Sequence, residues 1–162
     1  MKYLFLILMV STVFSCSSSN DSENISIVEK YVKSVENLDY TNMESLLADN
    51  YLGYGPSAGD SIGKIAALEN WKDNVENLYQ KIEYTRSQFA RVTINDGPNK
   101  GDWVAHWAEL TIEYKDGKGP VKIWANSNYI VENGKIVKSI AFYNEADVLR
   151  QLGYLFINPN GL

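Results

Sequence analysis

The chain contains one histidine and one cysteine in 162 residues, so few side chains are available for acid–base or thiol chemistry. His106 titrates near neutral pH without help from its surroundings, and beside a cavity it could act as a general base. Alternation along residues 103–112 places His106 on one strand face with Val104 and Leu110, and Glu109 on the other face. The alternative is a histidine that hydrogen-bonds within the sheet or faces a dimer interface. With so few nitrogen and sulfur ligands, we expect no transition-metal site and no cofactor.

The first sixteen residues have the layout of a secretion signal. Lys2 precedes an apolar run, residues 3–14, which is too short to cross a bilayer because a spanning helix takes about 20 residues. Ser15 and Cys16 follow, and this ending resembles the lipobox of bacterial lipoproteins. The resemblance implies removal of residues 1–15, a diacylglyceryl group on the Cys16 thiol, a further acyl chain such as palmitate, and lasting attachment to the lipid bilayer. A signal peptide with a chance cysteine is the alternative.

The residues after Cys16 predict how the folded part is held. Residues 17–24 are polar throughout and indicate a tether of at most about 28 Å, followed by one domain over residues 25–157 and a tail over 158–162. Ser17 is not the acidic residue that retains some bacterial lipoproteins at the inner membrane. We therefore expect attachment to the outer membrane, facing the periplasm.

The charge of the chain argues against nucleic-acid partners. The formal net charge is −5, and removal of Lys2 with the leader makes it one unit more negative. Such a chain is repelled by phosphate backbones, and neither a basic stripe nor a Gly-rich phosphate loop is present in the sequence.

Hydrophobic periodicity divides the domain into helices and then strands. Helical spacing covers residues 25–38 and the segment Ser61–Leu78, where Ser61 or Asp60 would cap the helix. Thr41–Glu44 is a capping-box pattern that predicts a short helix between them, and residues 51–59 read as a short strand or loop. The expected strands are residues 82–94, 103–114, 121–131 and 136–143, with a last helix over 145–152. Three helices followed by four antiparallel strands predict an α+β domain.

Four short segments carry a family resemblance. Ile27–Val32, Gly63–Lys64, Tyr129–Ile136 and Gln151–Gly153 occur in an order that resembles the NTF2-like superfamily, which includes SnoaL-like cyclases and ketosteroid isomerases. The resemblance covers roughly residues 27–154. It implies a cone in which three N-terminal helices pack on a curved antiparallel sheet of four or more strands, with a short C-terminal helix and an apolar cavity. It also implies that homodimers through the sheet are common.

The resemblance indicates which positions would carry chemistry. The isomerases hold an enolate with a tyrosine on the first helix and a protonated aspartate on the third long strand, while a second, ionised aspartate moves the proton. Tyr31 matches the first of these positions. Gly55 falls at the base, Ser127 at the second donor, and Asn144 where cyclase-like relatives often carry aspartate. Because three acidic positions are neutral here, we expect ligand binding rather than proton-shuttling chemistry.

Aromatic side chains are the remaining signal. Eleven Tyr and four Trp exceed what one core requires, and these residues combine flat apolar faces with a polar group, as ligand pockets do. Tyr51, Tyr79 and Trp124 are expected near the same region as the predicted ligand-binding residues. Those are Tyr31, Tyr54, Trp71, His106, Ser127 and Tyr129.

Three hypotheses follow for the function of the domain. The favoured one is a binding domain that takes a small apolar or amphipathic ligand in a conical pocket without catalysis. The second is a SnoaL-like isomerase, hydratase or cyclase with His106 and Tyr31 as catalytic residues. The third is an interaction module whose cavity is closed by Trp71 and Trp124.

Overall fold

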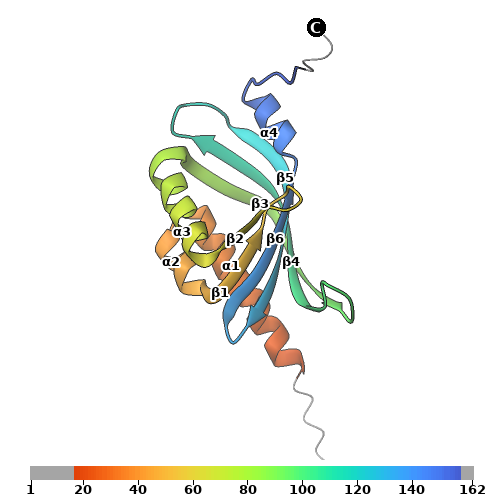
Figure 1. The fold of residues 1–162 in the computed structure, drawn as a ribbon. Helices are drawn as coiled ribbons and strands as arrows, with labels where there is room; N and C mark the ends of the chain where they lie inside the picture. The colour runs from red at the N-terminus through yellow and green to blue at the C-terminus, as the bar shows by residue number, and fades with distance from the viewer. Residues whose placement is uncertain (1–16, 158–162) are drawn as a thin grey trace, which may run out of the picture.

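The computed structural model describes residues 17–157, with side chains described from residue 22 onward. Within these residues, four α-helices and one π-helix accompany a six-stranded sheet (Figure 1). The helices are α1 (Ser17–Glu36), α2 (Tyr40–Leu46), α3 (Lys64–Asp73), the π-helix η1 (Asn74–Leu78) and α4 (Glu145–Gln151). The strands are β1 (Leu47–Tyr54), β2 (Ser61–Gly63), β3 (Tyr79–Ile94), β4 (Gly101–Tyr114), β5 (Val121–Glu132) and β6 (Lys135–Tyr143). The predicted leader, Cys16 and the tail 158–162 lie outside the described residues.

The first helix begins eight residues earlier than predicted. Residues 17–24 contain neither Gly nor Pro, so the backbone can continue as a helix toward the N-terminus, and they form about two turns of α1. The residues expected to form a polar tether with a reach of at most about 28 Å are therefore helical and span about 12 Å. Beyond it, Val28, Val32 and Val35 are buried on one face of the helix.

The next two helices start differently from the prediction. α2 is capped by Asp39 rather than Thr41, because the Asp39 Oδ1 accepts a hydrogen bond from the Asn42 backbone N–H at 3.0 Å. α3 starts at Lys64, since Ser61, expected as its cap, lies in β2 instead. In the described chain, two helices precede the first strand and the third follows β2, so the predicted run of three consecutive helices is corrected.

The sheet is mixed, which corrects the prediction of an antiparallel sheet. Its strand order is β2-β1-β6-β5-β4-β3, and β1 pairs with β6 in parallel while the other neighbours are antiparallel. Leu47 lies opposite Ile136, so both strands start at the same end of the sheet. A parallel pair needs a crossover connection, and here the connection contains α3, η1 and the four strands β2, β3, β4 and β5. The alternation of apolar and polar residues predicts where strands lie, but it does not show whether neighbouring strands run parallel or antiparallel.

The four long strands predicted from alternation are present with small shifts at their ends. Asn133 and Gly134 both have positive φ, 50° and 73°, as a tight two-residue hairpin requires. A bulge between Thr85 and Gln88 in β3, where Arg86 has a φ of 54°, inserts one residue opposite β4.

The helices α1, α2 and α3 cover one face of the sheet, and the main core lies between these layers (Figure 1). Met43, Leu47, Val104 and Ile136 are among its buried residues. α4 lies at the end of the sheet opposite the start of α1 (Figure 1). Among residues 17–157, no helix is both long enough and apolar enough to span a membrane.

Candidate ligand pocket

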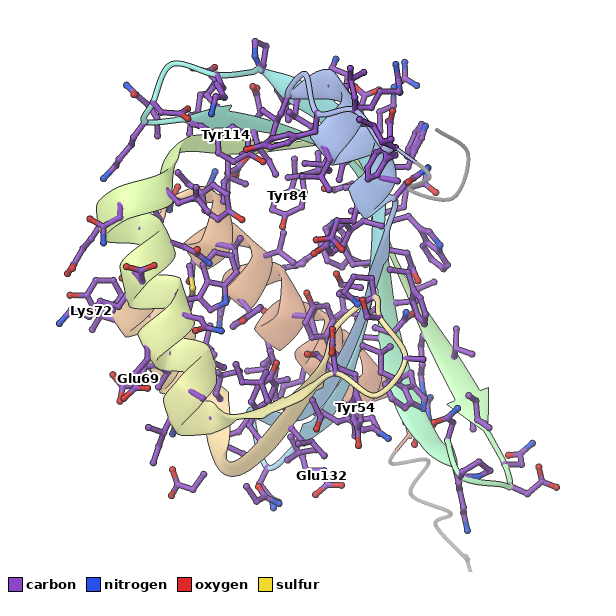
Figure 2. The ribbon with its side chains drawn as sticks, turned by 45° about the horizontal axis from the view of Figure 1, so that its top comes forward. Tyr54, Glu69, Lys72, Tyr84, Tyr114 and Glu132 are labelled. Carbon is purple, nitrogen blue, oxygen red and sulfur yellow. The ribbon has the colours of Figure 1, made fainter. Side chains whose placement is uncertain are left out.

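A cavity of about 500 Å³ lies between the helical layer and the inner face of the sheet. It is more enclosed than the other hollows found on the described surface. Figure 2 looks into the molecule from the end at which α4 lies. Tyr84 lies inside the ring of helices and strands, and Tyr114 and Tyr54 lie on opposite sides of it. Its volume falls in the range of ordinary small-molecule sites.

The buried end of the cavity is lined by hydroxyl groups that lie beside polar neighbours. Trp71 lies near the Tyr31 hydroxyl and Ser127 near the Tyr129 hydroxyl, and each neighbour partly offsets the rise in tyrosine pKa that burial causes. The rings of Tyr31 and Tyr129 meet edge to face with centroids 5.8 Å apart. Three elements, α1, α3 and β5, thus bring their side chains to one point.

A second hydroxyl pair lies on the strands β1 and β6. Tyr51 Oη and Ser139 Oγ are 2.6 Å apart in a hydrogen bond across the parallel strand pair. Burial raises the pKa of Tyr51, Tyr31, Tyr129 and Tyr84 above the ordinary value of a tyrosine. These hydroxyls therefore stay protonated at neutral pH and can both donate and accept hydrogen bonds.

The other end of the cavity, formed by Tyr79, Tyr114, Tyr143 and Glu145 and termed the wider end, is aromatic and less buried than the end at Tyr31 and Tyr129. The ring of Tyr79 lies 5.8 Å from that of Tyr114 and 6.4 Å from that of Trp71, tilted in both pairs. Burial, together with the neighbouring Tyr114 and Tyr143, raises the pKa of Tyr79 to about 12. Glu145, at the start of α4, lines the same end, and burial together with the negative charge of Glu145 raises the pKa of Tyr143.

His106 does not line this cavity. It is 3 % exposed, stacks on Phe89 with ring centroids 4.4 Å apart, and meets Tyr84 edge to face at 5.4 Å. Its Nε2 is in a hydrogen bond with Ser87 Oγ at 3.1 Å. Burial lowers the pKa of His106 to about 4, so the imidazole is neutral at pH 7. His106 therefore lies on the cavity side of β4 but behind Tyr84, which does line the cavity.

The other predicted site residues come together. Tyr31, Tyr54, Trp71, Ser127 and Tyr129 all line the cavity, from four different elements. Gly55, which the sequence resemblance predicts at the position of the isomerase base, lines it as well. Asn144 does not line it. Its side chain caps α4 by accepting a hydrogen bond from the Asp147 backbone N–H at 3.0 Å.

Trp124 lies elsewhere than expected. It is 60 % exposed on the outer face of the sheet, where Arg86 stands over its ring. Strand alternation accounts for the difference, because Ile123 and Ala125 line the cavity and the residue between them points the other way. A cavity closed by Trp71 and Trp124 together is therefore not what the fold provides.

Several lining residues were not among the predicted site residues. Tyr84, Tyr114, Tyr143 and Ser139 line the cavity from β3, β4 and β6. Tyr114 shares strand parity with Leu110, so extending the His106 face along β4 would have found it. The same extension along β3 would not have found Tyr84. The bulge at Arg86 reverses which alternate residues of β3 face the cavity.

Comparison with known proteins gives matches to solved structures only. No protein-family model matches the chain, and no curated protein matches it. A candidate polyketide cyclase from Xanthomonas campestris superimposes with a TM-score of 0.65 at 14% identity, covering 82% of this chain and 98% of that one. An LEH-like epoxide hydrolase from M. tuberculosis gives a TM-score of 0.62 at 18% identity, with 82% and 91% covered.

A third match is a protein with a ketosteroid isomerase-like fold from Catenulispora acidiphila, solved in complex with trimethylamine. It gives a TM-score of 0.62 at 15% identity and covers 80% of this chain and 93% of that one. Other matching structures are described as NTF2-like proteins of unknown function. The chain has the NTF2-like fold. Solved structures that share it include isomerase-like, hydrolase and cyclase proteins, so the NTF2-like fold by itself does not choose a reaction.

Proposed function

We propose that this chain is an envelope lipoprotein whose NTF2-like domain binds a small apolar or amphipathic molecule in the cavity without transforming it. The observation that carries the proposal is the neutral wall at the buried end. Gly55 and Ser127, which the family resemblance matches to positions where the isomerases place carboxyl groups, line the cavity, and the buried hydroxyls of Tyr31 and Tyr129 stay protonated. Such an end can hold a ligand by packing and hydrogen bonds but has no carboxylate or imidazole to take a proton, since the one lining carboxylate, Glu145, lies at the other end.

The catalytic alternative requires His106 to reach a bound substrate. Tyr84 lines the cavity while His106 contacts Tyr84 from behind, and the His106 Nε2 is engaged with Ser87. A pKa near 4 leaves the imidazole a weak base. These observations favour binding over an isomerase, hydratase or cyclase that uses His106 and Tyr31.

The ligand can be identified directly. Native mass spectrometry of the protein purified from its own membrane should show a bound small molecule that is lost on denaturation. Tyr129→Ala should reduce its occupancy, because the substitution removes a ring and a hydroxyl from the buried end. Phe142→Ala, on the outer sheet face, is the control and should not change it. A ligand-free native protein that turns over a substrate would contradict the proposal.

Two partners belong to the same proposal. The lipid bilayer would hold the chain through acylated Cys16, at the outer membrane on the periplasmic side. A second copy would pack on the outer face of the sheet, where Trp107, Trp124 and Phe142 are 42 %, 60 % and 52 % exposed. Analytical ultracentrifugation should then show a dimer that Trp124→Glu converts to a monomer, because a buried carboxylate without a partner is costly.

A further inference from the structure

Aromatic rings form an unusually large share of the cavity wall. Nine of the lining side chains are Tyr or Trp, and they come from α1, α3 and five of the six strands. A site for a purely aliphatic ligand needs no such number of rings, since Leu, Ile and Val bury apolar surface equally well. The faces of the rings carry the negative side of the aromatic quadrupole.

The charge of the wall has the same sign as the ring faces. Apart from the tyrosines, Glu145 is the one titratable side chain among the described residues that line the cavity. Neither Lys nor Arg is found among those lining residues. The electrostatic influence of Asp60 also reaches Tyr143, at the same end as Glu145. An anionic ligand would therefore find no counter-charge in the cavity.

These features meet at the wider end of the cavity. Tyr79 and Tyr114 lie with ring centroids 5.8 Å apart and planes tilted by 55°, so their faces are not closed against each other by parallel stacking. Tyr143 lies within electrostatic reach of both and of Glu145. Tilted aromatic faces with a nearby carboxylate are the arrangement that recognises alkylated ammonium groups.

We propose that the wider end of the cavity binds the alkylated ammonium head of a small organic cation, whose remaining polar atoms meet the hydroxyls at the buried end. The proposal rests on the proposed function in that the cavity holds a ligand, and it names the chemical class of that ligand. The chain makes the same kind of contact with its own lysine, because the Lys138 Nζ lies 5.2 Å from the ring centroid of Tyr54.

The test compares two probes of nearly the same shape. Choline and 3,3-dimethylbutan-1-ol differ in that a quaternary nitrogen replaces a quaternary carbon, so the charge is the variable. Binding to the purified full chain is followed by NMR through the indole N–H of Trp71, which lines the cavity together with Tyr31. We expect choline to bind about tenfold more tightly than the alcohol, as a desolvated cation–π site would give.

Single substitutions locate the effect. Tyr143→Leu removes a ring and should weaken choline several-fold while the alcohol changes little. Tyr143→Phe keeps the ring and should stay near the wild type. Glu145→Gln should weaken choline alone, and Phe142→Leu, next in sequence but outside the cavity wall, should alter neither probe.

The outcomes separate the two proposals. If the alcohol binds as tightly as choline, the cationic ligand is refuted while ligand binding by the cavity stands. If neither probe shifts the Trp71 signal and the native protein carries no ligand, both proposals fail. If choline binds more tightly but Tyr143→Leu and Glu145→Gln leave it unchanged, the cation binds elsewhere and the assignment to this cavity is wrong.

Discussion

Tyr51 is positioned in the cavity wall by a neighbour that has no side chain. A Cβ placed on Gly53 would lie 2.5 Å from the Tyr51 hydroxyl oxygen and 3.1 Å from its Cζ. The absence of a side chain at Gly53 therefore lets the Tyr51 ring lie along β1 and its hydroxyl reach Ser139. This is a steric requirement for glycine, since the φ of Gly53 is not among the positive ones.

Gly53→Ala should displace the Tyr51 hydroxyl and break its hydrogen bond to Ser139. We expect a loss of about 1–2 kcal/mol in the free energy of unfolding, measured by urea denaturation. Tyr51→Phe in the same chain removes the oxygen that the new methyl group would strike. The double variant should then lose less than the sum of the two single losses, and strict additivity would contradict this account.

His106 couples the stability of the fold to pH. Its pKa falls from 6.5 in the unfolded chain to about 4 in the folded one because burial disfavours the charged imidazole. The unfolded state therefore binds more protons between these two values. Stability is fully present above about pH 6.5 and declines as the pH falls toward 4, by at most about 3 kcal/mol.

His106→Gln should remove this pH dependence. The free energy of unfolding of the variant should change less between pH 7 and pH 4.5 than that of the wild type, measured by urea denaturation at each pH. Carboxylates with lowered pKa values, such as Glu36 and Asp102, are present in both proteins and cancel in the comparison. If the two proteins show the same dependence of unfolding free energy on pH, the pKa of His106 in the folded state is not lowered by burial.

At the scale of elements, α4 forms one wall of the wider end and is fastened to the sheet by one side chain. The Gln151 amide donates to the Lys122 carbonyl and accepts from the Lys122 backbone N–H, both at 2.9 Å. Val148, Leu149 and Leu152 of this region line the cavity. The position of α4 thus determines how far the wider end is covered.

Gln151→Ala should loosen α4 from β5. We expect faster hydrogen exchange over residues 145–152, with a loss of global stability of about 1 kcal/mol, because the Lys122 backbone groups can bind water instead. Gln151→Glu keeps the acceptor and loses the donor, so its exchange should be intermediate. Unchanged exchange in Gln151→Ala would show that apolar contacts alone hold α4.

The same elements show how far the sequence could be interpreted. Alternation located the four long strands, and Asn133–Gly134 located their tightest turn, because both signals are local. Parallel pairing of β1 with β6 was missed, since it joins segments far apart in the chain. Five of the six residues predicted to bind a ligand line the cavity, and the position of His106 behind Tyr84 follows from packing that no periodicity reports.

At the scale of the whole molecule, the start of α1 and the wider end of the cavity lie at opposite ends. The turn between β3 and β4 lies near the start of α1, whereas the turn between β4 and β5 lies beside α4 in both views (Figures 1 and 2). If the chain is anchored through Cys16, as proposed, the opening of the cavity faces away from the bilayer. A ligand would then enter from the aqueous compartment, which suits an organic cation better than a lipid drawn from the membrane.

Labels at the two turns would measure this orientation. Asp96 lies in the β3–β4 turn and Lys118 in the β4–β5 turn, both exposed, and an acylated Cys16 leaves an introduced cysteine as the sole free thiol. A fluorophore on Asp96→Cys should be quenched by spin-labelled lipid in reconstituted vesicles, whereas one on Lys118→Cys should not, because quenching falls away within about the length of one lipid. Adding Cys16→Ser should release the protein and abolish quenching at both positions. Stronger quenching at position 118 than at 96 would place the opening against the membrane, and the ligand would have to be sought among lipids.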